Sequence, residues 1–155
     1  MKILMVCLGN ICRSPMAEGI LQHKADVAGL GWTVESAGTN GFHVGEAPHH
    51  LSQKVATENG LNICQQRARK FVAKDFENFD KIYVMAEDVM IDVKRIAGKS
   101  VDVNKVDYFL NELNAGKNQD VPDPWYGKED GFVEVYDLIN KTCDAIIAKK
   151  AVRKN

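Results

Sequence analysis

The chain has 155 residues, of which 45% are hydrophobic and 26% are charged, and its formal net charge is −1. These values are typical of a single globular domain, here residues 1–155, that is long enough to bury a core. They argue against a nucleic-acid binder, because no basic surplus could neutralise phosphates, and no segment has the length of a membrane span or the pattern of a secretory signal.

The first predicted element is a short apolar run, residues 3–6, which has the character of a buried strand. Cys7 follows directly, and the loop after it contains Gly9 and Asn10, the residue types that most readily take a positive φ. Ser14 then has the properties of a helix N-cap, and Pro15 those of the first helical residue. The pattern therefore predicts a strand, a tight loop and a helix in immediate succession.

The rest of the chain continues this alternation. Strands are predicted over residues 32–37, 81–86 and 101–110, helices over residues 15–28, 50–59, 88–97 and 132–147, and a long loop over 111–122. Such alternation predicts an α/β fold with an open parallel sheet that is covered by helices on both faces. Ligands of such folds bind beyond the carboxyl ends of the strands, which is where Cys7 stands.

The segment from Cys7 to Ser14 combines a thiol, a guanidinium and several backbone N–H groups. The helix start carries roughly half a positive charge and Arg13 a full one, and both favour the thiolate form of Cys7. The same N–H groups and Arg13 are suited to hold a phosphate. Together they indicate attack by sulfur on phosphorus. The alternative is that Cys7 is merely a small buried residue at a strand end.

Residues 6–17, Val-Cys-Leu-Gly-Asn-Ile-Cys-Arg-Ser-Pro-Met-Ala, resemble the signature of low molecular weight protein tyrosine phosphatases. Residues 36–39 and 123–127 resemble two further landmarks of that family. The resemblance implies a three-layer sandwich with a four-stranded parallel sheet, and metal-free, cofactor-free hydrolysis of phosphotyrosine in protein substrates through a cysteinyl-phosphate. It also implies Cys7 as nucleophile, Arg13 as transition-state clamp, and Asp123 as general acid and then base.

The resemblance assigns the surrounding residues as well. The phosphate-binding loop would comprise Leu8, Gly9, Asn10, Ile11, Cys12 and Ser14, and phosphate or other oxyanions would inhibit by occupying it. Support for the loop would come from Ser36 and from Gln66, which stands where many relatives have His. The aromatic rim that meets the substrate would be Phe42, Trp125 and Tyr126, with core packing as the alternative for Phe42.

Asp123 and Ile11 bear on the substrate. A departing phenolate needs a positioned proton donor, because its conjugate acid has a pKa of about 10. Taken alone, however, an Asp before Pro124 is more often a turn former. At position 11, relatives that act on phosphoarginine tend to have Thr, whereas this chain has an isoleucine that suits a flat ring.

The chain has four cysteines, Cys7, Cys12, Cys64 and Cys143, which is sparse for a disulfide scaffold and predicts a reduced, cytoplasmic protein. None has the spacing of a metal site. Cys12 either packs beneath the loop or forms a reversible disulfide with Cys7.

Three other functions are alternatives to that of a tyrosine phosphatase. An arsenate reductase on the same fold would need further cysteines near residues 75–90, and none occurs there. A phosphoarginine phosphatase is opposed by Ile11, and a mere phosphate-binding module would not need Cys7, Arg13 and Asp123 together. No apolar stripe is left for a stable interface, and we expect a monomer or a weak dimer.

Overall fold

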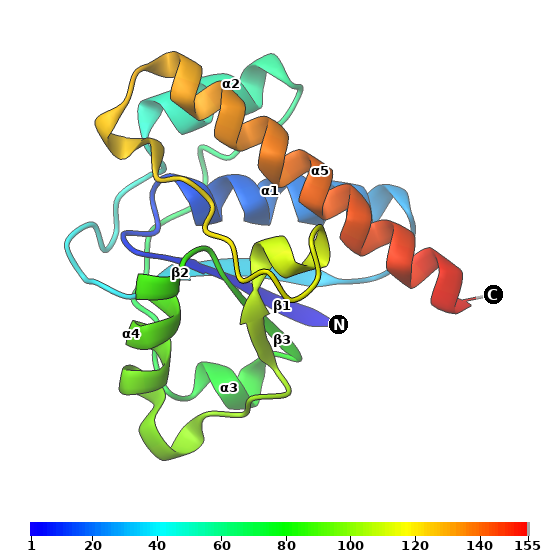
Figure 1. Ribbon diagram of the computed structural model, residues 1–155. Coiled ribbons are helices and arrows are strands. Elements are labelled where there is room, and N and C mark those ends of the chain that lie inside the picture. Colours follow the sequence, from blue (N-terminus) through cyan, green and yellow to red (C-terminus); the bar gives the residue numbers. More distant parts are fainter. Residues whose placement is uncertain (155) are drawn as a thin grey trace.

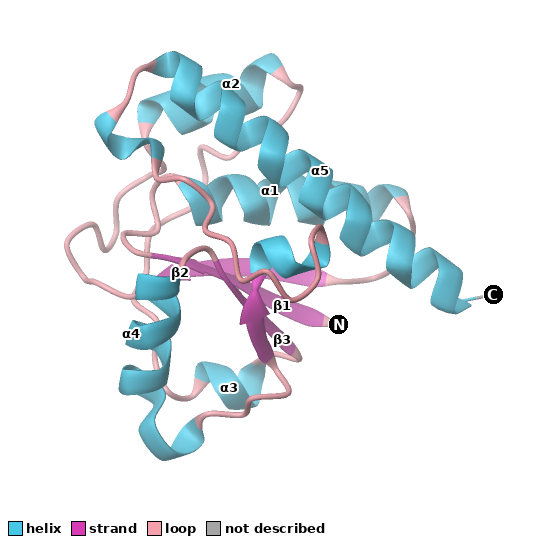
Figure 2. Cartoon of the chain, viewed as in Figure 1, coloured by secondary structure: helices cyan, strands magenta, loops and turns pink. Residues whose placement is uncertain are grey.

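The computed structural model describes residues 1–154, with side chains described as far as residue 150. Its centre is one sheet of four parallel strands in the order β2-β1-β3-β4 (Figure 2). The strands are β1 (Lys2–Cys7), β2 (Thr33–Gly38), β3 (Lys81–Val84) and β4 (Val106–Tyr108). The expected four-stranded parallel sheet with helices on both faces is therefore confirmed.

Helices cover both faces of this sheet (Figure 1). One face carries α1 (Arg13–Val27), α2 (His50–Glu58) and α5 (Glu129–Lys154), and the other carries α3 (Asp75–Asn78) and α4 (Glu87–Ala97). Three 3₁₀ turns are η1 (Gly98–Ser100), η2 (Phe109–Glu112) and η3 (Pro124–Tyr126). None of the helices described is both long enough and apolar enough to cross a membrane.

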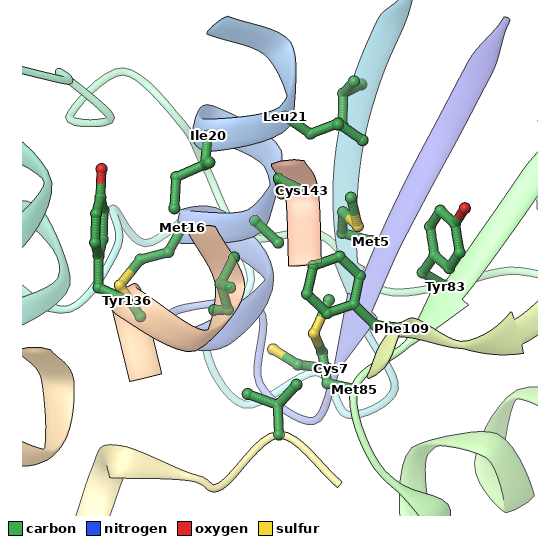
Figure 3. Close-up of a cluster of buried hydrophobic side chains, with 14 of the residues drawn as sticks. Met5, Cys7, Met16, Ile20, Leu21, Tyr83, Met85, Phe109, Tyr136 and Cys143 are labelled. Carbon is green, nitrogen blue, oxygen red and sulfur yellow. The ribbon is translucent and has the colours of Figure 1, made fainter. Parts of the chain in front are cut away.

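Strand β1 divides its side chains between two cores. Met5 and Cys7 (Figure 3) belong with Ile3 to the core under α1 and α5, whereas Leu4 and Val6 belong to the core under α4. Successive side chains point to opposite faces of a strand, so a strand that is buried on both faces must be apolar throughout. Residues 3–7 are accordingly at most 2% exposed. The same alternation aims the Cys7 thiol toward α1.

Several element boundaries differ from the sequence-based expectation. Helix α1 begins at Arg13, and Ser14 is not its N-cap, because its hydroxyl contacts Cys7 and Asn10 instead. Strand β4 is shorter than residues 101–110, α5 begins three residues before residue 132, and the single turn α3 was not expected at all. These ends depend on contacts with distant segments and leave no local periodicity.

Candidate active site

The loop of residues 8–12 joins the carboxyl end of β1 to the start of α1, and neighbouring segments hold its carbonyl groups. The carbonyl oxygens of Cys7 and Leu8 accept from the N–H groups of Thr39 (3.1 Å) and Asn40 (3.0 Å), and that of Ile11 accepts from His49 N–H (2.7 Å). The loop is thus fastened from outside by the segments that follow β2.

These bonds decide where the N–H groups of the loop point. In a planar trans peptide the N–H lies opposite the carbonyl of the preceding residue, so the N–H groups of Leu8, Gly9 and Cys12 point away from the fastening segments. Within the described residues these three groups donate to no protein acceptor. Backbone N–H groups with no protein acceptor that converge on one side of a loop are suited to bind an anion.

Asn10 and Gly9 serve the loop in different ways. Asn10 has a φ of 58°, in the left-handed region, as expected, whereas Gly9 does not take a positive φ. At Gly9 the requirement is space, because a Cβ there would lie 3.1 Å from Cδ2 of His43. Gly9 therefore allows the His43 ring to pack directly on the loop.

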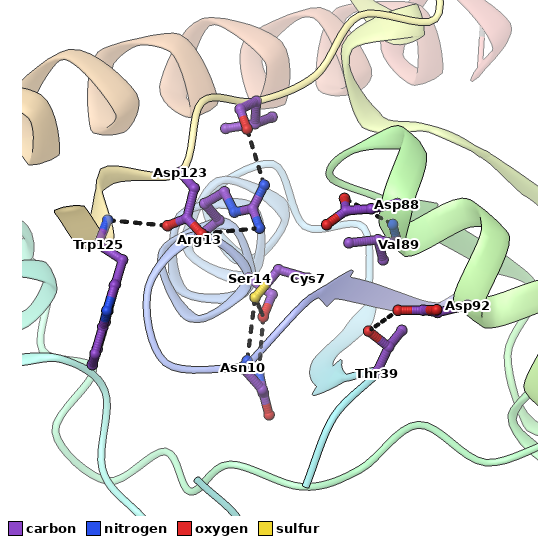
Figure 4. Close-up of polar contacts among 11 residues, drawn as sticks. Cys7, Asn10, Arg13, Ser14, Thr39, Asp88, Val89, Asp92, Asp123 and Trp125 are labelled. Carbon is purple, nitrogen blue, oxygen red and sulfur yellow. Dashed lines mark hydrogen bonds and ion pairs between the residues drawn. The ribbon is translucent and has the colours of Figure 1, made fainter. Parts of the chain in front are cut away.

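The sulfur of Cys7 receives hydrogen-bond donors from the loop and from α1 (Figure 4). Its Sγ lies 3.0 Å from Ser14 Oγ and accepts from the backbone N–H of Asn10 at 3.3 Å. Burial raises the pKa of the nearby Cys12 thiol to about 12, with a further contribution from the negative charges of Cys7 and Asp123. Of the two thiols in this loop, Cys12 is therefore held in its protonated, unreactive form.

Arg13 is buried and retains unused donor capacity. Its Nη1 donates to the Val121 carbonyl at 3.0 Å, and its Nη2 lies 3.7 Å from Asp123 Oδ2. Its Nε is buried and has no acceptor among the described residues. A guanidinium anchored at one nitrogen, with another nitrogen free, is suited to bind an oxyanion.

Asp123 uses its two carboxylate oxygens for two purposes. Oδ1 accepts from Trp125 N–H at 3.0 Å and caps η3, and Oδ2 is the atom that faces Arg13. Asp123 thus forms the turn that is expected of an Asp before Pro, and it also lines the pocket. Oδ1 therefore holds the carboxyl group in place, and Oδ2 remains available to a ligand in the pocket.

These groups surround a single pocket of about 310 Å³, with Cys7 at its floor. Its wall includes residues from three separate segments: Cys7, Leu8, Gly9, Ile11, Cys12, Arg13, Asn40, Phe42, His43, Asp123, Trp125 and Tyr126. The rim is aromatic and open: Phe42 is 85% exposed, Tyr126 91% and Trp125 43%. Phe42 is thus not a core residue, and an aromatic ligand would have rings to pack against.

Asn40 and His43 also line this pocket, and the sequence motifs assign a role to neither. The His43 ring is 5.5 Å from the Trp125 ring, and its Nδ1 lies 2.8 Å from Glu46 Oε2. The Trp125 ring also lies 5.4 Å from the His49 ring. Trp125 therefore contacts two histidines from a segment about 80 residues away in sequence, a placement that no local motif reveals.

The two expected loop supports are placed differently. Ser36 lies directly behind the loop, where its Oγ accepts from Asn10 Nδ2 at 2.9 Å. Gln66 Nε2 instead donates to the Pro15 carbonyl at 3.1 Å, so Gln66 holds the first turn of α1 and bonds to none of residues 8–12.

Among the described residues, no three His, Cys, Asp or Glu side chains converge as metal ligands.

Gly38, at the end of β2, lies against the back of the loop. A Cβ at this position would stand 2.9 Å from each of Asn10 N, Gly9 C and Leu8 O, all of them backbone atoms that cannot rotate away. Gly38→Ala should therefore weaken the binding of inorganic phosphate by roughly tenfold and lower the unfolding free energy by about 1–3 kcal/mol. Calorimetric titration and urea unfolding measure these effects.

Gly131→Ala is the matched control, because a Cβ there meets no atom within 4 Å. It should leave phosphate affinity unchanged. If Gly38→Ala bound phosphate as tightly as Gly131→Ala, the loop would not depend on its contact with β2.

Comparison with known proteins gives a consistent result over the whole chain. A family model described as low molecular weight phosphotyrosine protein phosphatase matches residues 2–155. A putative low molecular weight protein-tyrosine-phosphatase of Synechocystis is 38% identical over 95% of this chain and 94% of its own. The crystal structure of YfkJ from Bacillus subtilis has a TM-score of 0.90 at 33% identity, covering 100% of this chain and 97% of that one. An arginine phosphatase from Drosophila has a TM-score of 0.87 at 30% identity, covering 97% and 98% of the respective chains.

Proposed function

Because the chain belongs to the low molecular weight phosphotyrosine protein phosphatase family, we propose that this pocket carries out the reaction, with Cys7 as nucleophile, Arg13 as phosphate clamp and Asp123 as acid and base. The observation that carries the assignment is the position of the Cys7 sulfur. It lies at the floor of the pocket with two hydrogen-bond donors, and Arg13 and Asp123 line the same pocket.

In the first step the Cys7 thiolate attacks phosphorus. An S–P bond forms, the P–O bond to the tyrosine oxygen breaks, and protonated Asp123 gives its proton to the departing phenolate. The free N–H groups of the loop and the unpaired Nε of Arg13 bind the phosphate oxygens as charge develops on them. The phenol leaves, and phosphate remains on Cys7.

In the second step Asp123, now ionised, removes a proton from water as the water oxygen attacks phosphorus. The S–P bond breaks, inorganic phosphate forms and the Cys7 thiolate returns. Ser14 and Asn10 N–H act at both stages, because each can donate to sulfur whenever sulfur carries negative charge. No cofactor is needed for either step.

The pocket wall supports an aryl phosphate as substrate. Ile11 is 7% exposed and lines the pocket, and Phe42, Trp125 and Tyr126 surround its mouth. A flat ring gains from contact with these apolar walls, whereas a guanidinium would have to give up its hydration against them. This favours phosphotyrosine over phosphoarginine, although the similar Drosophila protein is described as an arginine phosphatase.

The remaining cysteines give little support for an arsenate reductase. Such an enzyme passes a disulfide from the nucleophile to other thiols. Cys143 is fully buried in the core between α1 and α5, and burial raises the pKa of its thiol well above the usual range. Cys64 is partly exposed but does not line the pocket. The arrangement suits a nucleophile that turns over by hydrolysis.

The wild-type protein should hydrolyse phosphotyrosine peptides and p-nitrophenyl phosphate, with a bell-shaped pH profile whose maximum lies below neutrality. The substrate must be ionised while Asp123 is protonated. We expect phosphoarginine to react at least roughly tenfold more slowly, inorganic phosphate to inhibit competitively, and EDTA to leave the rate unchanged. Absence of p-nitrophenol release in every mildly acidic buffer would contradict the proposal.

A further inference from the structure

Behind the active-site loop, a chain of hydrogen bonds runs from the Cys7 sulfur to a partly buried carboxylate, Glu18. Ser14 Oγ is 3.0 Å from Cys7 Sγ and accepts from Asn10 Nδ2 at 2.8 Å. The same Asn10 nitrogen donates to Ser36 Oγ at 2.9 Å, and Ser36 Oγ donates to Glu18 Oε1 at 2.7 Å. The proposed reaction uses Cys7, Ser14 and Asn10 but not Glu18.

The directions of these bonds follow from the number of protons. The Oδ1 of Asn10 accepts from the backbone N–H of Arg69 at 3.0 Å, so its Nδ2 must donate. Ser36 has one hydroxyl proton, which it donates in a hydrogen bond to the ionised Glu18. Ser36 therefore offers only lone pairs to Asn10, and it becomes a stronger acceptor because its own proton is engaged by a charge.

This bond matters because Asn10 determines the shape of the loop. Asn10 has the left-handed φ of 58°, its backbone N–H donates to Cys7 Sγ, and its amide also holds Ser14. Ser14, which accepts from Asn10, has its single proton left for the sulfur. A weaker hydrogen bond between Asn10 Nδ2 and Ser36 would therefore loosen both groups that face the Cys7 sulfur, the Ser14 hydroxyl and the Asn10 N–H.

Glu18 faces few charged groups. Ser36 and Glu35 approach it from β2, Arg69 approaches from the segment after residue 60, and no described cation forms an ion pair with it. Burial raises the pKa of Glu18 to about 6, with Glu35 adding to the rise and Ser36 and Arg69 opposing it. Its charge therefore changes within the mildly acidic range in which the enzyme is expected to work.

We propose that ionised Glu18 is a positioning residue of the phosphatase, acting through Ser36 and Asn10 to hold the donors that face Cys7. Protonation of Glu18 relaxes this hold, so that the reactivity of Cys7 falls on the acidic side of the working range. The proposal rests on Cys7 being the nucleophile of the proposed function.

The test measures the rate at which iodoacetamide alkylates Cys7, identified by mass spectrometry, from pH 4.5 to 8. It uses the wild type, Glu18→Gln, Ser36→Ala and the double variant, and it needs no turnover. The wild-type profile should show an inflection near pH 6 that both single variants lack. At pH 6.5 Glu18→Gln should lower kcat for p-nitrophenyl phosphate roughly 3- to 10-fold and change KM less than about twofold.

The double variant separates action through Ser36 from a general structural effect. If Glu18 acts through Ser36, Glu18→Gln should have no further effect once Ser36 is alanine. A full additional loss in the double variant, or an inflection that persists in Glu18→Gln, would overturn the proposal.

Glu35→Gln is the matched control, since Glu35 is close enough to influence Glu18 electrostatically but has no hydrogen bond to the network. Removing its charge should shift the inflection to lower pH without abolishing it, and kcat should be unchanged. Loss of the inflection in this control would also overturn the proposal. Failure of the wild type to hydrolyse aryl phosphates would refute the proposed function, and the alkylation profile would still report on Glu18.

Discussion

Cys7→Ser should lower the rate of phosphate ester hydrolysis by roughly 10³-fold or more, while inorganic phosphate still binds. A serine hydroxyl must lose its proton to attack phosphorus, and the groups that contact the Cys7 sulfur, Ser14 and Asn10 N–H, supply donors and no base. The loop N–H groups and Arg13, which hold the phosphate, are unchanged. Steady-state assays with p-nitrophenyl phosphate and calorimetric titration with phosphate measure the two properties separately.

Cys12→Ser is the control for this variant. Burial keeps the Cys12 thiol protonated, with a pKa of about 12, and its replacement should change kcat by no more than a few-fold. A phosphoenzyme trapped by acid quench should carry its label on Cys7 in this variant, as in the wild type. Retention of more than about a tenth of the activity by Cys7→Ser would show that another group is the nucleophile.

Asp123→Asn should lower kcat for phenyl phosphate by about 10²- to 10⁴-fold and abolish the alkaline limb of the pH profile. Asparagine keeps the shape of the side chain, and its oxygen can still accept from Trp125 N–H, so the turn should persist. What is lost is the proton for the leaving phenolate and, in the second step, the base for water.

The leaving group distinguishes loss of the acid from general damage. A p-nitrophenolate leaves readily without a proton, so its ester should lose less activity than phenyl phosphate does. Asn40→Ala changes another residue of the pocket wall and should affect both esters alike. An equal loss of activity toward the two esters in Asp123→Asn would contradict the role of general acid.

The family and the loop could be predicted from the sequence because their signals are local. The apolar run, Cys7, Asn10 and the helix start are contiguous, and the resemblance based on residues 6–17 is confirmed by the family match. The parallel sheet followed from the alternation of elements. The structure also brings Asp123 to the same pocket as Cys7, although 116 residue positions separate them.

What could not be predicted depends on segments that are distant in sequence. His43 packs on Gly9 and Trp125, Gln66 reaches the Pro15 carbonyl, and Val121 supplies a carbonyl to Arg13. Every residue has a backbone carbonyl, so the sequence cannot indicate which one will bind Arg13. A histidine in a loop belongs to no periodic pattern from which its contacts could be predicted. Glu18 is harder still, since on the helix it reads as an ordinary polar residue until Ser36 of β2 is placed against it.

The partly buried carboxylate of Glu18 also affects how folding stability depends on pH. Its pKa is raised from 4.5 to about 6 in the folded chain, so between these values the folded state binds more protons than the unfolded state. Stability conferred at this site is therefore greatest below about pH 4.5 and declines as pH rises toward 6. At neutral pH the ionised group costs about 2 kcal/mol, a sizeable share of a typical net stability of about 5–15 kcal/mol. Burial of the Glu18 carboxylate, which the hydrogen bond from Ser36 only partly offsets, thus makes the fold less stable at the pH values at which this carboxylate is ionised.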